Sequence, residues 1–195
     1  MSHKIYHTEG FVIAGSNYGE ANRYLSIFTR DFGLVRASAQ SLRKATSKLR
    51  FSLQDFSYSR VDLVRGKEIW RITNAKHISG YEKFGGNMES IKMLANIFRL
   101  LRRLCHGEEE NPELFIYLQE IYSFLEKEEL SAEDIKNFEC VSVLKILHCL
   151  GYIGESSDLS IFVSNNLSHS MLGQAKLARR TLIGEINKSL RESQL

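Results

Sequence analysis

The chain has 195 residues, of which 43% are hydrophobic and 25% charged, and a formal net charge of +3. This composition is ordinary for a globular protein of one or two small domains. No segment is apolar over the ~20 residues that a membrane span needs, and the first ten residues lack the apolar region of a secretory signal. We therefore expect a cytoplasmic protein with no membrane partner.

The charge is unevenly distributed along the chain. Residues 1–80 hold thirteen Lys/Arg against six Asp/Glu, a net +7, whereas residues 81–195 hold thirteen against seventeen, a net −4. A basic domain beside an acidic one suggests a polyanion-binding face carried on a body that contacts proteins. We expect two domains, 1–80 and 81–195, with protein-partner contacts on the second.

The first domain shows the two-residue period of β-strands in five short segments. In the third segment, Val35, Ala37 and Ala39 share one face. Five short strands joined by hairpin-like turns indicate a small closed barrel, and the OB-fold is the usual five-stranded barrel. We expect the strands at residues 7–16, 23–29, 34–39, 56–64 and 68–73, with turns at 17–20, 31–33 and 65–67.

The second domain shows helical periodicity. Asn111 followed by Pro112 fits an N-cap and a first helical residue, and Ser131 with Asp134 resembles a capping box. The predicted fold class is therefore α+β and multi-domain, with an OB-fold barrel followed by an all-α domain. We expect helices over residues 88–106, 112–124, 132–150 and 175–190, and a loop over 154–166.

No catalytic or metal-binding motif stands out in the sequence. The acids of the first domain are scattered singly, whereas a two-metal nuclease needs several converging carboxylates. The three cysteines, Cys105, Cys140 and Cys149, lie on helix-patterned segments and are interpreted as reduced and buried. We interpret Glu108–Glu110 as a solvated cap near the next helix. The sequence predicts no enzyme, cofactor or metal.

Binding of a polyanion is better supported than catalysis, because residues 40–51 form a basic loop. It carries four cations within eight residues and no acid between them, so they repel one another unless an anion is present. These cations are Arg43, Lys44, Lys48 and Arg50.

Aromatic rings lie among the cations of the first domain. We expect Phe11, Phe28 and Phe56 to fill the barrel core. Tyr18, in a turn, and Trp70, beside Arg71, are left open between packing in the core and stacking on bases.

The order and spacing of several short motifs resemble the N-terminal domain of the bacterial DNA-repair family RecO. The helical half is compatible through Asn111–Phe115 and Leu150–Tyr152. The motifs lie at residues 9–13, 17–23, 27–33, 47–50, 53–56, 63–66 and 73–75.

The resemblance implies a recombination mediator that works at the nucleoid without a nucleotide cofactor. Such proteins bind single- and double-stranded DNA through the OB-fold and anneal complementary strands. They bind the acidic C-terminal tail of single-stranded DNA-binding protein (SSB), and with RecR they help load RecA onto SSB-coated single strands.

The resemblance also suggests site residues. Arg23, Arg30, Lys48 and Arg50 occupy motif positions and are predicted DNA contacts. Charge and placement alone add Arg43, Lys44, Arg65, Lys67 and Arg71. For the SSB tail, which needs a cation beside an apolar groove, the candidates are Arg99, Arg102 and Arg103 beside Phe98 and Leu101, or Arg179 and Arg180.

The chain departs from the family pattern in one respect. Many members carry a four-cysteine zinc site after the Leu-Gly-Tyr segment, but residues 153–163 contain no cysteine, and His169 with the distant Cys149 does not supply four ligands.

The alternative function is an OB-fold RNA-binding or ribosome-associated factor, because a basic groove does not distinguish RNA from DNA. A nuclease is the third hypothesis.

Overall fold

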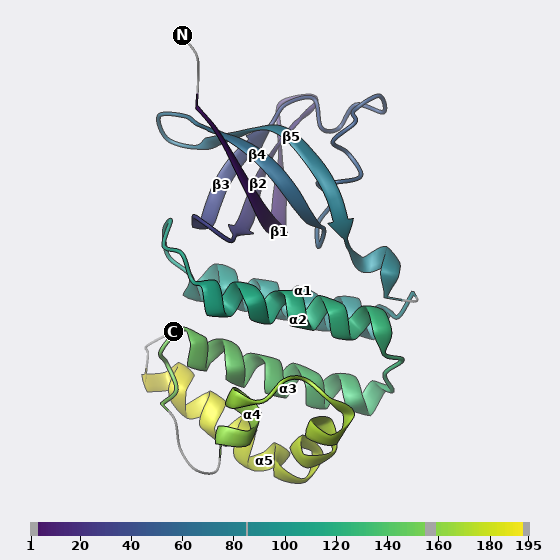
Figure 1. The fold of residues 1–195 in the computed structure, drawn as a ribbon, viewed down its shortest axis with the longest axis vertical. Helices are drawn as coiled ribbons and strands as arrows, with labels where there is room; N and C mark the ends of the chain where they lie inside the picture. The colour runs from purple at the N-terminus through teal and green to yellow at the C-terminus, as the bar shows by residue number, and fades with distance from the viewer. Residues whose placement is uncertain (1–3, 85, 155–158, 193–195) are drawn as a thin grey trace.

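The computed structural model describes residues 4–84, 86–154 and 159–192, and it places a β-barrel on a stack of helices (Figure 1). The barrel strands are β1 (Ile5–Tyr18), β2 (Asn22–Thr29), β3 (Gly33–Ala39), β4 (Tyr58–Arg65) and β5 (Trp70–Ser79). A 3-10 turn, η1 (Tyr81–Lys83), leads to helices α1 (Met88–Leu104), α2 (Pro112–Lys127), α3 (Ala132–Cys149), α4 (Ser160–Ser164) and α5 (His169–Glu192).

The five strands close into a barrel in the order β1-β2-β3-β5-β4. β3 and β5 run parallel, and the other neighbouring strands run antiparallel. A small five-stranded barrel is the OB-fold architecture, so the predicted fold class is confirmed.

Strand alternation places side chains as the sequence predicts in β3. Val35, Ala37 and Ala39 are buried, whereas Arg36 is exposed. They join an inner barrel core that also includes Val12, Leu25, Ile27, Leu53, Leu63 and Trp70.

Several predicted strand bounds are wrong. The largest error is in the last strand, predicted to end at residue 73, because β5 continues to Ser79. β1 extends to Tyr18, which still pairs with Asn22, so the first turn is shorter than expected. β4 begins at Tyr58 and not at Phe56, because Phe56 has a φ of 67° that a strand cannot accommodate.

A second core lies between the barrel and the helices. Phe11, Phe28 and Tyr58 are buried on the outer side of their strands, where they pack with Phe115 and Tyr122 of α2. The expectation that Phe11 and Phe28 fill the inner barrel is therefore wrong. Phe56 likewise packs outward, with its ring 5.9 Å from that of Phe98 on α1.

The helix starts follow the capping chemistry of the sequence. The Asn111 side chain accepts a hydrogen bond from the backbone N–H of Leu114, and Ser131 and Asp134 form a capping box. The expected ends are less accurate. α1 stops at Leu104, α5 begins at His169, and the short helix α4 lies within the expected loop. Residues 155–158 of that loop lie outside the described residues.

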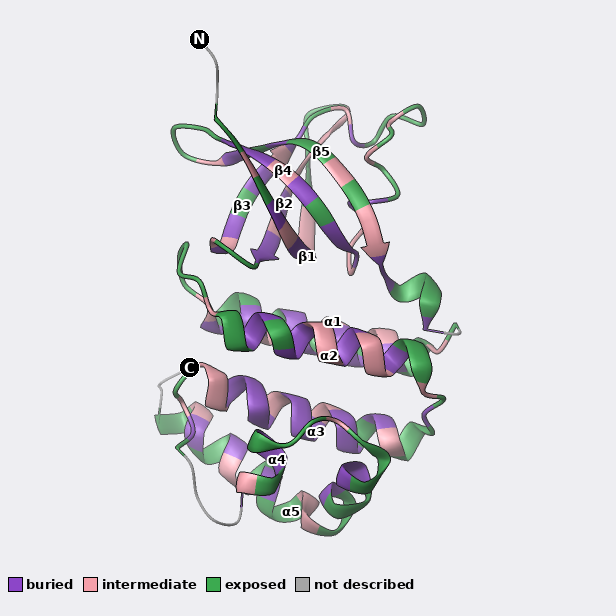
Figure 2. Ribbon diagram, in the orientation of Figure 1, coloured by how far each residue is buried: buried purple, intermediate pink, exposed green. Residues whose placement is uncertain are grey.

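The helices form layers below the barrel. α1 and α2 lie directly beneath it, α3 lies under them, and α4 and α5 form the far layer (Figure 1). Buried residues line the facing sides of these layers, and exposed residues line the outer side of α5 (Figure 2). β5 ends at Ser79 and η1 begins at Tyr81, which agrees with the expected boundary at residue 80. The apolar core nevertheless crosses this boundary, because it joins barrel residues to residues of α1 and α2.

Candidate nucleic-acid interface

The basic loop leaves the barrel at the end of β3 that faces away from the helices (Figure 1). Leu42 and Leu53 are buried in the barrel core and hold the segment at both ends. Between them, the cations of the loop are exposed: Arg43, Lys44, Lys48 and Arg50. Lys44, Lys48 and Arg50 make no ion pair with an acid among the described residues, so their charges are available to an anion.

Arg23 lies at the root of this loop. Its guanidinium donates to Asp55 Oδ1 at 3.0 Å, and its side chain is only 20% exposed. Arg43 donates to the carbonyl oxygens of Gly19 and Glu20, which ties the loop to the β1–β2 turn. A pocket of about 330 Å³ is lined by Arg23, Leu42, Arg43, Arg50, Leu53 and Gln54.

Arg30 lies at the opposite end of the barrel, where the barrel meets α2. It donates to Glu9 Oε2 at 2.8 Å, and its guanidinium lies 5.2 Å from the centre of the Phe115 ring. Arg60 and Tyr58 also donate to Glu9. The structure therefore separates Arg30 from the basic loop.

This network changes two ionisation equilibria. Burial raises the pKa of Glu9, but the hydrogen bonds from Tyr58 and Arg60 and the charges of Arg30 and Arg60 outweigh it, so the pKa lies below its ordinary value of 4.5. Burial and the hydrogen bond to Glu9 raise the pKa of Tyr58 to about 12. Glu9 is therefore ionised and Tyr58 neutral near pH 7.

Glu108 joins the α1–α2 linker to the barrel. Its carboxylate accepts a hydrogen bond from Trp70 Nε1 at 2.8 Å and lies 3.3 Å from the Arg65 guanidinium. Glu108 is 39% exposed, as expected for a solvated residue, but its carboxylate binds the barrel and does not cap α2, whose N-cap is Asn111. Trp70 is only 2% exposed and belongs to the core, which decides against stacking on bases. Lys67 and Arg71 are exposed.

The outer face of β2 and β3 carries a cation that the sequence analysis missed. Arg36 is exposed, and its guanidinium lies 4.9 Å from the centre of the Tyr24 ring. Tyr18, 55% exposed, lies 4.7 Å from Tyr24 between ring centres. Arg71 of β5 continues this face, because it pairs with Ser38 of β3, which pairs with Tyr24. The alternation that buries Val35 and Ala37 places Arg36 on the opposite, outer face, so the sequence could have identified this cation.

The two groups of helix cations have different surroundings. Arg99, Arg102 and Arg103 are exposed on α1, but Phe98 and Leu101 are at most 1% exposed. These two buried side chains therefore do not line an exposed apolar groove beside the arginines. On α5, by contrast, Leu177 is 89% and Ile183 42% exposed, close in sequence to Arg179 and Arg180.

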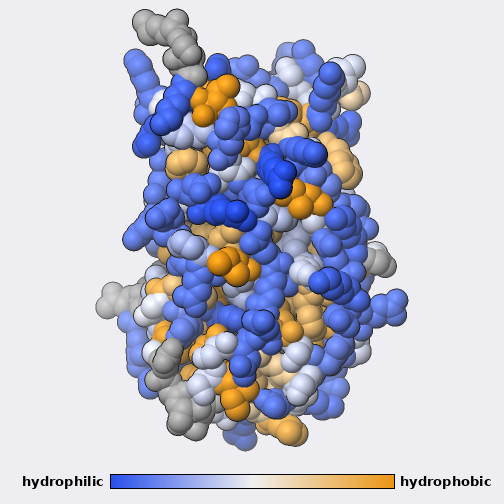
Figure 3. Space-filling model, viewed as in Figure 1, coloured by the Kyte–Doolittle hydropathy of each residue, from blue (hydrophilic) through white to orange (hydrophobic). Residues whose placement is uncertain are grey.

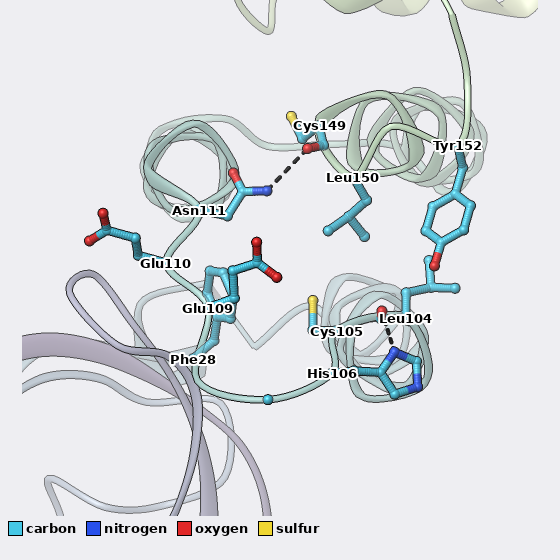
Figure 4. A pocket seen from close by; sticks show the side chains of 11 residues that line it. Phe28, Leu104, Cys105, His106, Glu109, Glu110, Asn111, Cys149, Leu150 and Tyr152 are labelled. Atoms are coloured by element: carbon cyan, nitrogen blue, oxygen red, sulfur yellow. Dashed lines mark hydrogen bonds between the residues drawn. The ribbon is translucent and has the colours of Figure 1, made fainter.

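A further pocket of about 310 Å³ lies at the junction of barrel and helices (Figure 4). Its wall includes Phe28, Cys105, Glu109 and Cys149, and Asn111 donates to the Cys149 carbonyl across it. Burial raises the pKa of Cys105 to about 11 and, with a contribution from Glu113, that of Cys149 to about 12. These thiols are therefore protonated near pH 7.

Across residues 4–84, 86–154 and 159–192, no three His, Cys, Asp or Glu side chains gather to hold a metal.

Comparison with known proteins identifies the barrel. Residues 1–81 match the family described as "Recombination protein O N terminal". The barrel matches the N-terminal domain of the RecO family. Within the described part, no helix is long and apolar enough to cross a membrane.

Individual RecO proteins are similar beyond the barrel. The "DNA repair protein RecO" of Dehalococcoides mccartyi strain BAV1 is 35% identical over 108 residues, which cover 55% of this chain and 43% of that protein. That of Heliobacterium modesticaldum is 28% identical over 154 residues, or 79% and 54%. That of Thermodesulfovibrio yellowstonii is 29% identical over 160 residues, or 80% and 61%. The chain thus spans about half the length of the curated RecO relatives it matches.

Proposed function

We propose that this protein is a DNA-binding recombination mediator that acts in DNA repair and recombination without turnover chemistry. The observation that carries the proposal is a RecO-type OB barrel with exposed loop cations that lack acidic partners. Such cations neutralise phosphates and release counterions, and this contact does not depend on sequence. The OB-fold binds oligonucleotides on the face of strands 2 and 3 and through the loops between strands 1 and 2 and between strands 4 and 5.

The structure divides the predicted DNA contacts into two groups. Lys44, Lys48 and Arg50, with Lys67 and Arg71, are exposed and have no acidic partner among the described residues, so we keep them as phosphate contacts. We also keep Arg43, whose guanidinium is held by two backbone carbonyls. The other three predicted contacts already pair with an acid, and we assign them to holding the interface in shape: Arg23, Arg30 and Arg65.

The way such a surface holds DNA supports a specific role in annealing and in RecA loading. Contacts to phosphates leave the base edges free, which suits annealing of complementary single strands and binding to both single- and double-stranded DNA. We propose that residues 1–80 bind the DNA and that residues 81–195 contact proteins. In that role the protein acts with RecR to load RecA onto SSB-coated single strands, in the cytoplasm at the nucleoid.

The test removes two loop charges. Lys48→Ala with Arg50→Ala should weaken binding to single- and double-stranded DNA, and should lower the slope of log affinity against log salt for single strands by about 1.4, or ~0.7 for each lost phosphate contact. Fluorescence anisotropy with labelled oligonucleotides measures both quantities. The control, Lys127→Ala with Lys136→Ala, removes the same charge from exposed helix positions. Equal affinity of the loop variant and the parent at the same salt would overturn the loop assignment.

We propose α5 as the partner surface for the acidic SSB tail. Of the two groups of predicted cations, and among the described residues, it is Arg179 and Arg180 that lie close in sequence to an exposed apolar side chain, Leu177. Titration with an SSB C-terminal peptide should show weaker binding after Arg179→Ala with Arg180→Ala. The comparison variant, Arg99→Ala with Arg103→Ala on α1, should bind like the parent. The reverse order would move the site to α1.

A further inference from the structure

The pocket of about 330 Å³ at the root of the basic loop has the chemistry of an anion site. Its apolar wall is formed by Leu42 and Leu53, which are at most 3% exposed. In the described part of the chain, no acidic side chain lines this pocket. The polar wall consists of side chains that carry N–H donors: Arg23 from β2, and Arg43, Arg50 and Gln54 from the segment between β3 and β4.

Two of the three arginines are already fixed in place. The Arg23 guanidinium lies so close to Gly15 of β1 that a Cβ there would stand 2.2 Å from its Nη2 atom, and the same nitrogen donates to Asp55 Oδ1. Arg43 donates to two backbone carbonyl oxygens of the β1–β2 turn. Side chains held in this way lose little conformational freedom when a ligand binds, so the pocket is preorganised.

The pocket holds a hydrogen-bond donor and positive charge that the protein itself does not use. Arg23 Nε is buried and has no hydrogen-bond partner, which is unfavourable unless a ligand supplies an acceptor. Asp55 balances the charge of Arg23, whereas Arg43 and Arg50 form no ion pair with an acid among the described residues. Three arginines against one carboxylate leave two uncompensated positive charges.

We propose that this pocket binds a phosphate monoester, the group found at the end of a DNA strand or on a free nucleotide. A monoester carries about two negative charges at pH 7 and presents three oxygens, whereas an internal phosphate of a strand carries about one charge and has one free oxygen fewer. Two uncompensated charges and guanidinium donors from separate elements suit the monoester better. The proposal goes beyond the proposed function, because contacts to internal phosphates do not distinguish the end of a strand.

The test compares single-stranded DNA of one sequence with a phosphate or a hydroxyl at its terminus, taking each end in turn and labelling the other. Fluorescence anisotropy should show about tenfold tighter binding of the phosphorylated strand. This preference should shrink as pH falls below about 6, where the monoester loses its second charge. In a parallel arm, calorimetry compares a nucleoside monophosphate with the nucleoside.

The two arms distinguish the sources of the monoester. Preference for the phosphorylated strand identifies a strand end, and binding of the monophosphate without that preference identifies a free nucleotide. Equal affinity with and without the phosphate in both arms would overturn the pocket assignment and leave DNA binding through the loop intact. If the unaltered protein bound no DNA, the proposed function itself would fail, and the nucleotide arm would still test the pocket.

Variants tie the preference to the pocket. Arg50→Gln should abolish it, and Gly15→Ala should reduce it, because the added carbon displaces the Arg23 guanidinium. The matched control is Lys44→Gln, at an exposed loop cation that does not line the pocket, and it should weaken both strands equally and leave their ratio unchanged. Circular dichroism melting checks that each variant is folded. The same ratio in Arg50→Gln and Lys44→Gln would also overturn the assignment.

Discussion

Gly33 of β3 lies directly against the backbone of Glu109 in the α1–α2 linker. A Cβ at position 33 would stand 2.0 Å from the Glu109 carbonyl oxygen, and Gly33 has a φ of 59°. This contact and the bond from Trp70 to Glu108 hold the linker to the barrel at two adjacent residues. The barrel and helices are therefore fixed to each other by polar and steric contacts as well as by their shared apolar core.

Gly33→Ala should destabilise the protein by at least about 2 kcal/mol, because it adds a backbone clash to the cost of left-handed φ. Urea denaturation measures the free energy of unfolding. Gly19→Ala is the control, since Gly19 has a similar φ of 55° but no atom closer than 3.9 Å to the added carbon. That variant should lose only the ~1–2 kcal/mol of the left-handed conformation. Equal losses would mean that the contact with Glu109 contributes nothing.

Glu108→Ala should cost about 1–3 kcal/mol, because it leaves the buried indole N–H of Trp70 without an acceptor. Trp70 is the single tryptophan of the chain, so its fluorescence reports on this bond directly. We expect its emission spectrum to shift together with the loss of stability. Glu110→Ala, at an exposed neighbouring position, should change neither. An unchanged spectrum in Glu108→Ala would contradict the bond.

The Glu9 network should make stability depend on pH. The pKa of Glu9 is depressed in the folded state, so its contribution is complete above the ordinary value of 4.5 and is lost as pH falls through the folded value. The free energy of unfolding of the parent should therefore fall more steeply below pH 4.5 than that of Glu9→Gln. Parallel pH profiles for the two proteins would show that the network does not stabilise the ionised carboxylate.

Cys105 and Cys149 should react slowly with thiol reagents. With pKa values of about 11 and 12, each thiolate fraction at pH 8 is at least about a hundredfold below that of an ordinary cysteine of pKa near 9. We expect slow modification in native protein and rapid modification in urea, followed by mass spectrometry. Fast native labelling at both sites would show that they are open to solvent.

Local sequence patterns predicted the barrel and the starts of α1, α2 and α3 correctly, but not the start of α5. The alternation of Val35, Ala37 and Ala39, and the capping residues Asn111 and Ser131, act over a few residues, so they can be read from the sequence. Strand ends were less predictable, because the end of β1 depends on pairing between Tyr18 and Asn22 across a turn.

The errors concern contacts between elements distant in sequence. Nothing near Glu108 shows that Trp70 and Arg65 will meet it. Phe11 and Phe28 were assigned to the barrel interior because periodicity separates two faces of a strand but does not show that helices cover the outer one. The predicted DNA contact Arg30 likewise pairs with Glu9 only after the strands have formed.

The hydropathy of the surface agrees with an interface based on charge. On the face seen in Figure 3, hydrophilic residues cover most of the barrel and helices, and apolar residues form small separate patches. Hydropathy does not separate acids from bases, so salt-dependent binding of a polyanion rests on the exposed Lys and Arg within this surface. DNA and RNA are also hardest to tell apart for a surface that binds mainly through their phosphates.

The most direct test of the central claim is therefore a competition experiment at fixed salt. Labelled single-stranded DNA bound to the protein is challenged with unlabelled single-stranded DNA, duplex DNA and a structured RNA of equal length. We predict that both DNAs compete, that the RNA competes less well, and that binding falls as salt rises. Stronger competition by the structured RNA, or no binding of DNA, would contradict a role in DNA repair and recombination.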